Sequence, residues 1–340
     1  MAEYSVERSD FDGYEAYVLR EGATSAEAQI VPALGANCIA FRAPPVGTSG
    51  PLVDLLPSIS DAADIGPTGY MAGNPILFPF PSRMRHGHFT FEGKTSQFDV
   101  DPDNGHHIHG LVATHPWVVE VAESTDAGAV LQTSIDLGAN EDIRRQFDYA
   151  CRLTVTFTLR DASLTLKGEV QNTGDQLLPM GLGYHPWFPA AFAAGGSRDE
   201  AEVQVPGRRL WQLTDELLPT GQILPAQGQL DLRRPRALAG NAYDHVFTDL
   251  VANAPGTLVD WSEATLRNPW AGLEIAVQAD ASFLQWVLYA PLDRPIVCLE
   301  PYTCTGDAAN LAARNIESGL ITVPPGLSWR STVRMLVRQT

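Results

Sequence analysis

The sequence feature that most constrains the fold is a strict alternation of apolar and polar residues near the middle of the chain. From Cys151 to Leu159 every second residue is apolar, and the residues between them are one arginine and three threonines. Successive side chains of a strand point to opposite faces, so a period of two predicts a strand with one buried face. A short turn at 160–162 leads to a second alternating run, which stops at Asn172-Thr173-Gly174. The two runs together predict a β-hairpin.

Shorter runs of the same kind recur along the chain and predict further strands. They are Phe89–Phe91, Trp117–Val121, Leu273–Val277, Phe283–Tyr289 and Val333–Val337. The 29 glycines and 25 prolines punctuate these runs. The clearest helical signal, Asp307–Arg314 with Asp307 as a candidate cap, covers only about two turns. Many strands with frequent turns predict an all-β sandwich or barrel with few short helices. The sequence contains no evident linker or repeat, so we expect a single domain over residues 1–340.

Charge and cysteine content limit the classes of partner and the compartment. The formal net charge is −17, which disfavours nucleic acid and anionic membranes as partners. The N-terminus has no secretory h-region, and no apolar run approaches the ~18 residues of a membrane span. The four cysteines form no CxxC pair, and Cys151 and Cys298 lie in apolar strand-like segments. We therefore expect buried thiols in a reduced cytoplasmic protein, with two disulfides as the alternative.

Two segments in the first third of the chain carry candidate binding residues. The stiff apolar run from 73 to 82 ends at Arg83 and Arg85, either of which could donate hydrogen bonds at a pocket rim. Three histidines follow within the four residues 106–109. If this segment is a strand, His107 and His109 share a face and could bind either a metal or a hydroxylated ligand. A cupin-like metal site would also need a Glu three or four residues further on, where the chain has Ala113 and Thr114.

Three later segments offer acid/base chemistry. His185 lies among aromatic residues in Gly181–Pro189, an arrangement that suits sugar binding because sugar C–H faces pack on rings. Asp244, in a short polar segment at 243–245, could accept hydrogen bonds from hydroxyl groups. Glu300 ends an apolar strand-like run directly before Pro301, as a positioned general base would.

In order and flanking residues, these segments together resemble the aldose 1-epimerase (galactose mutarotase) family. The resemblance runs from about Leu34 to the C-terminus. It rests on Leu77–Arg83, on His109-Gly110 followed by Trp117, on His185–Phe188, and on Glu300–Thr303 with a later Pro325-Gly326. It implies a large antiparallel β-sandwich, the galactose mutarotase-like supersandwich, with a monosaccharide as substrate and with neither a metal nor a cofactor.

The resemblance also implies roles for single residues. Glu300 corresponds to the general base that takes a proton from the anomeric hydroxyl, and His185 to the general acid that protonates the ring oxygen. His109 and Arg83 correspond to residues that hold the ring oxygen and neighbouring hydroxyls, and Asp244 to a carboxylate that binds hydroxyls further along the sugar.

The sequence departs from the family pattern in several places and leaves alternatives open. Ser82 stands where the family often has Asn, and Pro186 follows the acid His where the best characterised branch has Ser. A shifted register would make Arg85 and His107 the working residues. The expected function is an aldose 1-epimerase. The alternatives are a hexose-6-phosphate mutarotase, a non-catalytic sugar-binding or regulatory module, and a cupin-like metalloenzyme. A phosphate pocket would draw on Arg85, Arg144, Arg145, Arg208 or Arg209. Sugar identity and oligomeric state stay open.

Overall fold

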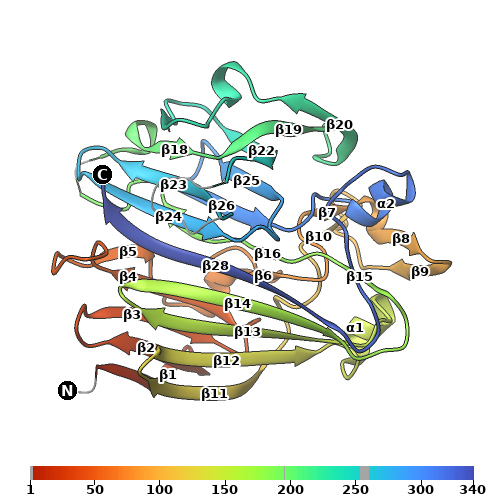
Figure 1. Cartoon of the computed structure of the whole chain (residues 1–340), viewed down its shortest axis with the longest axis horizontal. Helices are drawn as coiled ribbons and strands as arrows, with labels where there is room; N and C mark the ends of the chain where they lie inside the picture. Colours follow the sequence, from red (N-terminus) through yellow and green to blue (C-terminus); the bar gives the residue numbers. More distant parts are fainter. Residues whose placement is uncertain (1–2, 195, 253–259) are drawn as a thin grey trace.

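The chain folds mainly into antiparallel β-strands, as expected from the alternating patterns. The computed structural model describes residues 3–194, 196–252 and 260–340 (Figure 1). Within these ranges the helical elements are short: α1 (Glu141–Gln146), α2 (Ala308–Ala313) and the 3₁₀ turns η1 (Ala62–Ile65), η2 (Arg85–Gly87), η3 (Arg198–Glu200) and η4 (Gly228–Leu230). The prediction of an all-β fold with few short helices is confirmed.

Three large sheets contain most of the strands in the described part of the chain. The N-terminal sheet has the order β1 (Tyr4–Phe11), β2 (Tyr14–Glu21), β3 (Ala26–Val31), β4 (Asn37–Ala43), β5 (Val53–Leu56). The nine-stranded sheet has the order β11 (Val118–Thr125), β12 (Gly128–Asp136), β13 (Cys151–Arg160), β14 (Ser163–Asn172), β28 (Ser328–Gln339), β24 (Leu273–Ala279), β23 (Ser262–Asn268), β18 (Glu202–Gln204), β21 (Arg236–Ala237).

The third sheet carries the residues of greatest functional interest. Its order is β20 (Pro219–Pro225), β19 (Gly207–Leu213), β22 (Tyr243–Leu250), β25 (Gln285–Ala290), β26 (Ile296–Tyr302), β16 (Gly183–Tyr184), β6 (Ile76–Leu77), and β17 (Trp187–Pro189) also pairs with β26. Small pairs complete the fold: β7 (Arg83–Met84) with β10 (His107–Ile108), β8 (His88–Phe91) with β9 (Lys94–Gln97), and β15 (Leu178–Met180) with β27 (Ile321–Val323).

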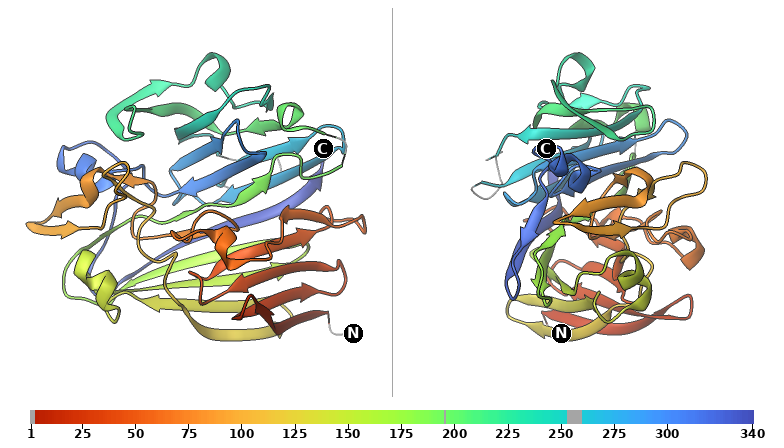
Figure 2. Two further views of the ribbon diagram at one scale, coloured as in Figure 1. Left: turned by 180° about the vertical axis from the view of Figure 1, so that it is seen from behind. Right: turned by 90° about the vertical axis from the view of Figure 1, so that its right-hand side faces the viewer.

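The sheets form two layers, which confirms the predicted sandwich. Strand β2 contacts β12 and β13, β3 contacts β13, β5 contacts β28, and β26 contacts β23, so the N-terminal and third sheets both face the nine-stranded sheet (Figure 2). The largest hydrophobic cluster lies between the layers and includes residues from Tyr4 to Val337. This shared core supports our proposal of a single domain over residues 1–340.

The predicted hairpin is confirmed as β13 and β14, which pair from Cys151↔Asn172 to Arg160↔Ser163. The other predicted runs fall on β8, β11, β24, β25 and β28, with ends that differ by a few residues. Helix α2 also forms where expected. Asp307, however, has a left-handed backbone (φ 55°) and makes no side-chain cap. Its carboxylate instead accepts hydrogen bonds from the backbone N–H of Arg85 and the side chain of Asn310.

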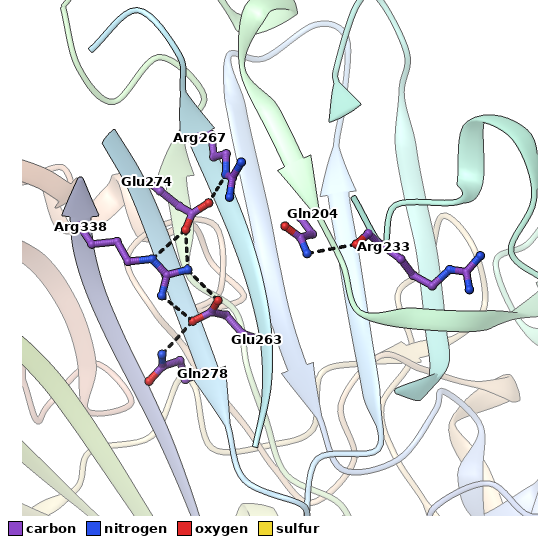
Figure 3. A network of polar contacts seen from close by, with 7 residues as sticks. All are labelled: Gln204, Arg233, Glu263, Arg267, Glu274, Gln278 and Arg338. Atoms are coloured by element: carbon purple, nitrogen blue, oxygen red, sulfur yellow. Dashed lines mark hydrogen bonds and ion pairs between the residues drawn. The ribbon is translucent and has the colours of Figure 1, made fainter. Parts of the chain in front are cut away.

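A network of charged side chains around two buried carboxylates links three strands of the nine-stranded sheet (Figure 3). The Arg338 guanidinium on β28 donates to Glu263 Oε1 on β23 at 2.7 Å and to Glu274 Oε1 on β24 at 2.8 Å. Glu274 also accepts from Arg267, and Glu263 accepts from Gln278 at 2.8 Å. Because both carboxylates are buried, they need these donors to offset the loss of water.

All four cysteines are buried and free, so the expected buried thiols are confirmed and the two-disulfide alternative is wrong. In the described ranges, no helix is long and apolar enough to cross a membrane.

Candidate active site

One pocket on the third sheet brings together the five residues to which the family resemblance assigned roles. It has a volume of about 280 Å³, and its walls include Arg83, His109, His185, Asp244 and Glu300. These residues come from five separate segments of the chain, so the fold assembles the site from distant parts.

Strand register explains how three of the walls meet. Asp244 on β22 lies opposite Tyr289 on β25, and Val287 on β25 lies opposite Glu300 on β26. Directly opposed residues share a face, and so do residues two apart on one strand. Asp244, Tyr289, Val287 and Glu300 therefore project from one face of three neighbouring strands.

His185 lies between β16 and β17, at the side of β26 that faces away from β25. Its ring stacks on Trp187, with ring centroids 5.0 Å apart and planes at 4°. Trp187 is held in turn, because its Nε1–H donates to the Tyr70 carbonyl at 2.9 Å. The nearby Gly183 is required by packing, since a Cβ there would lie 2.6 Å from the Tyr302 ring. The imidazole is therefore fixed in position.

His185 and Glu300 lie beside each other in the pocket wall. His185 Nε2 lies 3.5 Å from Glu300 Oε2, and the two residues are only 6% and 2% exposed. The Tyr302 hydroxyl donates a hydrogen bond to the same Glu300 oxygen. His185 Nδ1 is buried without a hydrogen-bond partner in the described structure.

His109 and Arg83 reach the pocket from the β7–β10 pair, in which Ile108 lies opposite Arg83. His109 Nδ1 accepts a hydrogen bond from the Ser82 backbone N–H at 3.2 Å. A neutral imidazole that accepts at Nδ1 carries its proton at Nε2, so His109 is a hydrogen-bond donor on its other side. The following Gly110 has φ +74°, and a Cβ there would lie 2.1 Å from the Phe78 carbonyl oxygen. Only glycine fits this turn.

Burial sets the protonation of the site. It raises the pKa of Glu300 well above its ordinary value, with the Tyr302 hydrogen bond acting in the opposite direction and Asp244 adding to the rise. It lowers the pKa of His185 to about 3. It also lowers the pKa of His109 well below its usual range, with the neighbouring His185 and Arg83 adding to the effect. Burial raises the pKa of Asp244, and Arg83 opposes this rise. The pair therefore favours a neutral His185 imidazole beside a protonated, uncharged Glu300 carboxyl group.

The alternatives Arg85 and His107 do not line this pocket. The Arg85 side chain is 41% exposed, and its guanidinium lies 3.9 Å from Asp307. Both ring nitrogens of His107 contact backbone carbonyls, those of Asp99 at 2.7 Å and Gly110 at 3.0 Å. The expectation that His107 and His109 share a strand face is wrong, because β10 ends at Ile108 and His109 has a left-handed φ of 66°. A cupin-like pair is therefore not formed.

One group of potential metal ligands among the described residues lies close enough together to hold a metal ion. His185, Cys298 and Glu300 offer one nitrogen, one sulfur and one oxygen atom, all within 4.8 Å of one another. Burial raises the pKa of the Cys298 thiol well above its ordinary value, so this sulfur is poorly suited to act as a thiolate ligand.

Several pocket residues were not predicted from the sequence, and Tyr302 is the most important of them. It lies two residues after Glu300 on the same strand, and side chains two apart share a face, so this spacing was a usable signal. Tyr70, Asp101 and Tyr289 also line the pocket. Each comes from a segment without a distinctive motif.

A larger hollow of about 460 Å³ lies elsewhere on the third sheet, around Trp211, Phe283 and Gln285. No histidine contributes to its described walls, so it lacks an acid/base pair of this kind.

Known proteins resemble this chain over most of its length. A crystal structure of a galactose mutarotase-like protein from Clostridium acetobutylicum superposes with a TM-score of 0.88 at 19% identity, covering 100% of both chains. The galactose 1-epimerase of Lactobacillus acidophilus gives a TM-score of 0.75 at 15% identity, covering 99% of this chain and 98% of that one.

Sequence comparison gives further relatives. The uncharacterized protein YphB of Escherichia coli is 28% identical over 77% of this chain and 82% of its own length. The galactose mutarotase of Sus scrofa is 27% identical over 49% of this chain and 48% of its own length. The sequence profile of the aldose 1-epimerase family matches residues 17–336. With this match over nearly the whole chain, the protein belongs to the aldose 1-epimerase family.

Proposed function

We propose that the protein is a mutarotase that interconverts the α and β anomers of an unphosphorylated aldose. The observation that carries the proposal is the buried His185–Glu300 pair, held 3.5 Å apart in a pocket lined by rings and hydrogen-bonding groups. The pocket's volume of about 280 Å³ is close to the lower end, about 300 Å³, of typical small-molecule sites. It therefore suits a single sugar ring.

The proposed reaction moves one proton in and one proton out. Glu300 takes the proton from the C1 hydroxyl while His185 gives a proton to the ring oxygen, and the C1–O5 bond opens. After rotation about C1–C2 the ring closes with the roles reversed. The acid and base share one transferable proton, which is on His185 before ring opening. The reactive form is therefore the tautomer with protonated His185 and ionised Glu300. Hydrogen bonds from sugar hydroxyls to Glu300 favour this tautomer when substrate is bound.

The remaining residues position the sugar. The Arg83 guanidinium and the Nε2–H of His109 donate hydrogen bonds to the ring oxygen and its neighbouring hydroxyls. Asp244 accepts hydrogen bonds from hydroxyls further along the ring. Tyr289 provides an apolar face for the C–H groups of the sugar.

The charge of the pocket favours a neutral sugar over a hexose phosphate. Arg83 is the single Arg or Lys among its described walls, which also contain Asp101, Asp244 and Glu300. A phosphate dianion would meet three carboxyl groups and only one arginine in these described walls. The arginines considered for phosphate binding lie outside these walls, and four of them contact acidic residues instead: Arg85, Arg144, Arg145 and Arg208. Arg209 lines the larger hollow.

We place the enzyme in the cytoplasm. Four free buried thiols suit a reducing compartment, in which structural disulfides are rare.

Polarimetry of freshly dissolved α-glucose and α-galactose tests the proposal. Wild-type protein should accelerate the approach to equilibrium, and Glu300→Gln or His185→Asn should each lower the rate by roughly 10²–10⁴-fold while the circular dichroism spectrum is retained. Saturable sugar binding without any acceleration would contradict the proposal and favour a non-catalytic sugar-binding module. Acceleration confined to hexose 6-phosphates would contradict the choice of an unphosphorylated substrate.

A further inference from the structure

The orientation of the His185 ring, the general acid proposed above, depends on packing as well as on its contact with Glu300. Nδ1 of His185 is buried without a hydrogen-bond partner among the residues that the structure describes. His109 differs, because its Nδ1 accepts a hydrogen bond from the Ser82 backbone N–H at 3.2 Å. The plane of the His185 imidazole is set instead by Trp187, whose ring plane lies at 4° to it. The position of this indole therefore governs the position of the acid.

The indole of Trp187 also contacts a positive charge. The guanidinium carbon of Arg294 lies 4.7 Å from the centroid of the Trp187 ring, within the range of about 6 Å for a cation–π contact. The indole donates from Nε1 to the Tyr70 carbonyl, and Tyr289 lies edge-on to it with ring centroids 6.1 Å apart. Trp187 is only 7% exposed, so these contacts leave little of its ring to water. Arg294 and His185 therefore both pack on one buried indole.

The turn that carries Arg294 is fixed at both ends. It joins β25 to β26 and runs from Pro291 to Pro295, and each proline ring restricts its own φ. At the first end, Arg198 donates from Nε to the Pro291 carbonyl at 3.0 Å. At the second end, the backbone N–H of Ala190 donates to the Pro295 carbonyl at 2.9 Å. The Arg294 side chain therefore extends toward Trp187 from a backbone that has little freedom.

The guanidinium of Arg294 forms no ion pair or hydrogen bond with the described residues, and its ring contact is with Trp187. The side chain is half-buried, which costs solvation that an ion pair would normally offset. Packing on an aromatic face offsets part of this cost. The charge of Arg294 also reaches the pocket. Burial raises the pKa of the pocket residue Tyr289 and of the Cys298 thiol, and Arg294 opposes both rises.

We propose that Arg294 is a positioning residue for the general acid: it holds the Trp187 indole against the His185 ring, so that Nε2 stays directed at the reacting oxygen. The proposal rests on the mutarotase function proposed above. Arg294 is not among the described walls of the catalytic pocket, so it has no contact with the sugar. We therefore expect Arg294 to affect the rate of proton transfer and to leave the affinity for the sugar unchanged.

Steady-state polarimetry with α-glucose and α-galactose tests this role. Arg294→Met removes the charge but keeps an unbranched side chain, and it should lower kcat roughly 3–10-fold while KM stays within about twofold of wild type. Arg294→Lys keeps a cation and should recover part of the lost kcat. Arg236→Met is the matched control, since it removes the same charge from an exposed position on β21 outside the pocket, and its kcat should equal that of wild type.

The NMR signal of the Cε1 proton of His185 gives a readout that does not depend on activity. The ring current of an indole shifts the signals of protons stacked on it, so this signal reports the contact between His185 and Trp187. It is assigned by its absence from the spectrum of His185→Asn. We expect Arg294→Met to move the signal toward that of an unstacked histidine and Arg294→Lys to move it less. Arg236→Met should leave it unchanged.

Failure of this proposal and failure of the proposed function give different results. An unmoved His185 signal in Arg294→Met, an unchanged kcat, or a rise in KM without a fall in kcat would each overturn the proposal and leave the mutarotase function standing. If wild-type protein accelerates neither sugar, the proposed function fails and the catalytic role of Arg294 fails with it. The NMR comparison then still shows whether Arg294 holds the His185 ring.

Discussion

Replacing Tyr302 by phenylalanine provides a sensitive test of the proposed acid/base pair. The Tyr302 hydroxyl donates a hydrogen bond to Glu300 and thereby lowers the pKa of that carboxyl, against a larger rise caused by burial. Phenylalanine keeps the ring that packs against Leu77 and Val287 but removes the donor. We expect Tyr302→Phe to raise the pKa of Glu300 further while the fold is preserved.

The size of the effect follows from the bond that is lost. A hydrogen bond to a charged group contributes about 1.5–3 kcal/mol. With 1.36 kcal/mol for each pKa unit, the pKa of Glu300 should rise by about 1–2 units. Burial already lowers the pKa of His185 to about 3, so the reactive tautomer, with ionised Glu300 and protonated His185, is the minor one-proton form. Its population, and with it the rate at pH values below the Glu300 pKa, should fall roughly 10–100-fold.

The pH profile of kcat/KM distinguishes this effect from a structural one. Because the pair loses its last proton from Glu300, activity is lost on the alkaline side as pH rises through the Glu300 pKa. Tyr302→Phe should move this alkaline limb upward by about 1–2 pH units. Tyr184→Phe is the matched control, since the buried Tyr184 hydroxyl has no hydrogen-bond partner among the residues that the structure describes, and its profile should match wild type. A lower rate with an unmoved alkaline limb would refute the reasoning.

Three further predictions concern sugar binding and the fold. Arg83→Lys should raise KM about tenfold by removing a forked donor, while Arg85→Lys should leave KM unchanged, as measured by steady-state polarimetry. Gly110→Ala should lower the free energy of unfolding by about 1–3 kcal/mol or more, because alanine is strained in the left-handed region and its Cβ would clash with a backbone carbonyl. Gly93→Ala is the control, since it is also left-handed but has open space around it, and it should lose less. Equal losses in urea denaturation would contradict the clash. Arg338→Met should lower the free energy of unfolding by about 2–4 kcal/mol, because two buried carboxylates lose their shared donor, while the activity per folded molecule is retained. An unchanged urea midpoint would show that the network contributes little.

Strong local patterns in the sequence predicted much of the fold. The β13–β14 hairpin followed from strict alternation, because both strands bury one face and expose the other. The N-terminal sheet was not predicted. Its strand β1 is largely polar along one edge of the molecule, and β3, β4 and β5 contain register shifts that interrupt the period of two. Short irregular alternation of this kind gives a weak signal.

The segments that form the candidate site could be predicted from the sequence, but in two of them the residue that faces the pocket could not. The five residues that the resemblance pointed to all line one pocket. The choice between Arg83 and Arg85, or between His107 and His109, could not be made from spacing. Strands β7 and β10 are only two residues long, and left-handed backbone at Ser82 and His109 breaks the alternation of faces. These conformations depend on contacts between the two segments, such as the bond from the Ser82 N–H to His109.

The most direct test of the central claim is the rate of exchange between α and β anomers at equilibrium, measured by exchange NMR with wild-type protein and with Glu300→Gln side by side. The account predicts that exchange cross-peaks grow with the concentration of wild-type protein. With Glu300→Gln the catalysed exchange rate should be roughly 10²–10⁴-fold lower, down to the uncatalysed level. A folded Glu300→Gln protein that exchanges the anomers as fast as wild type would contradict it.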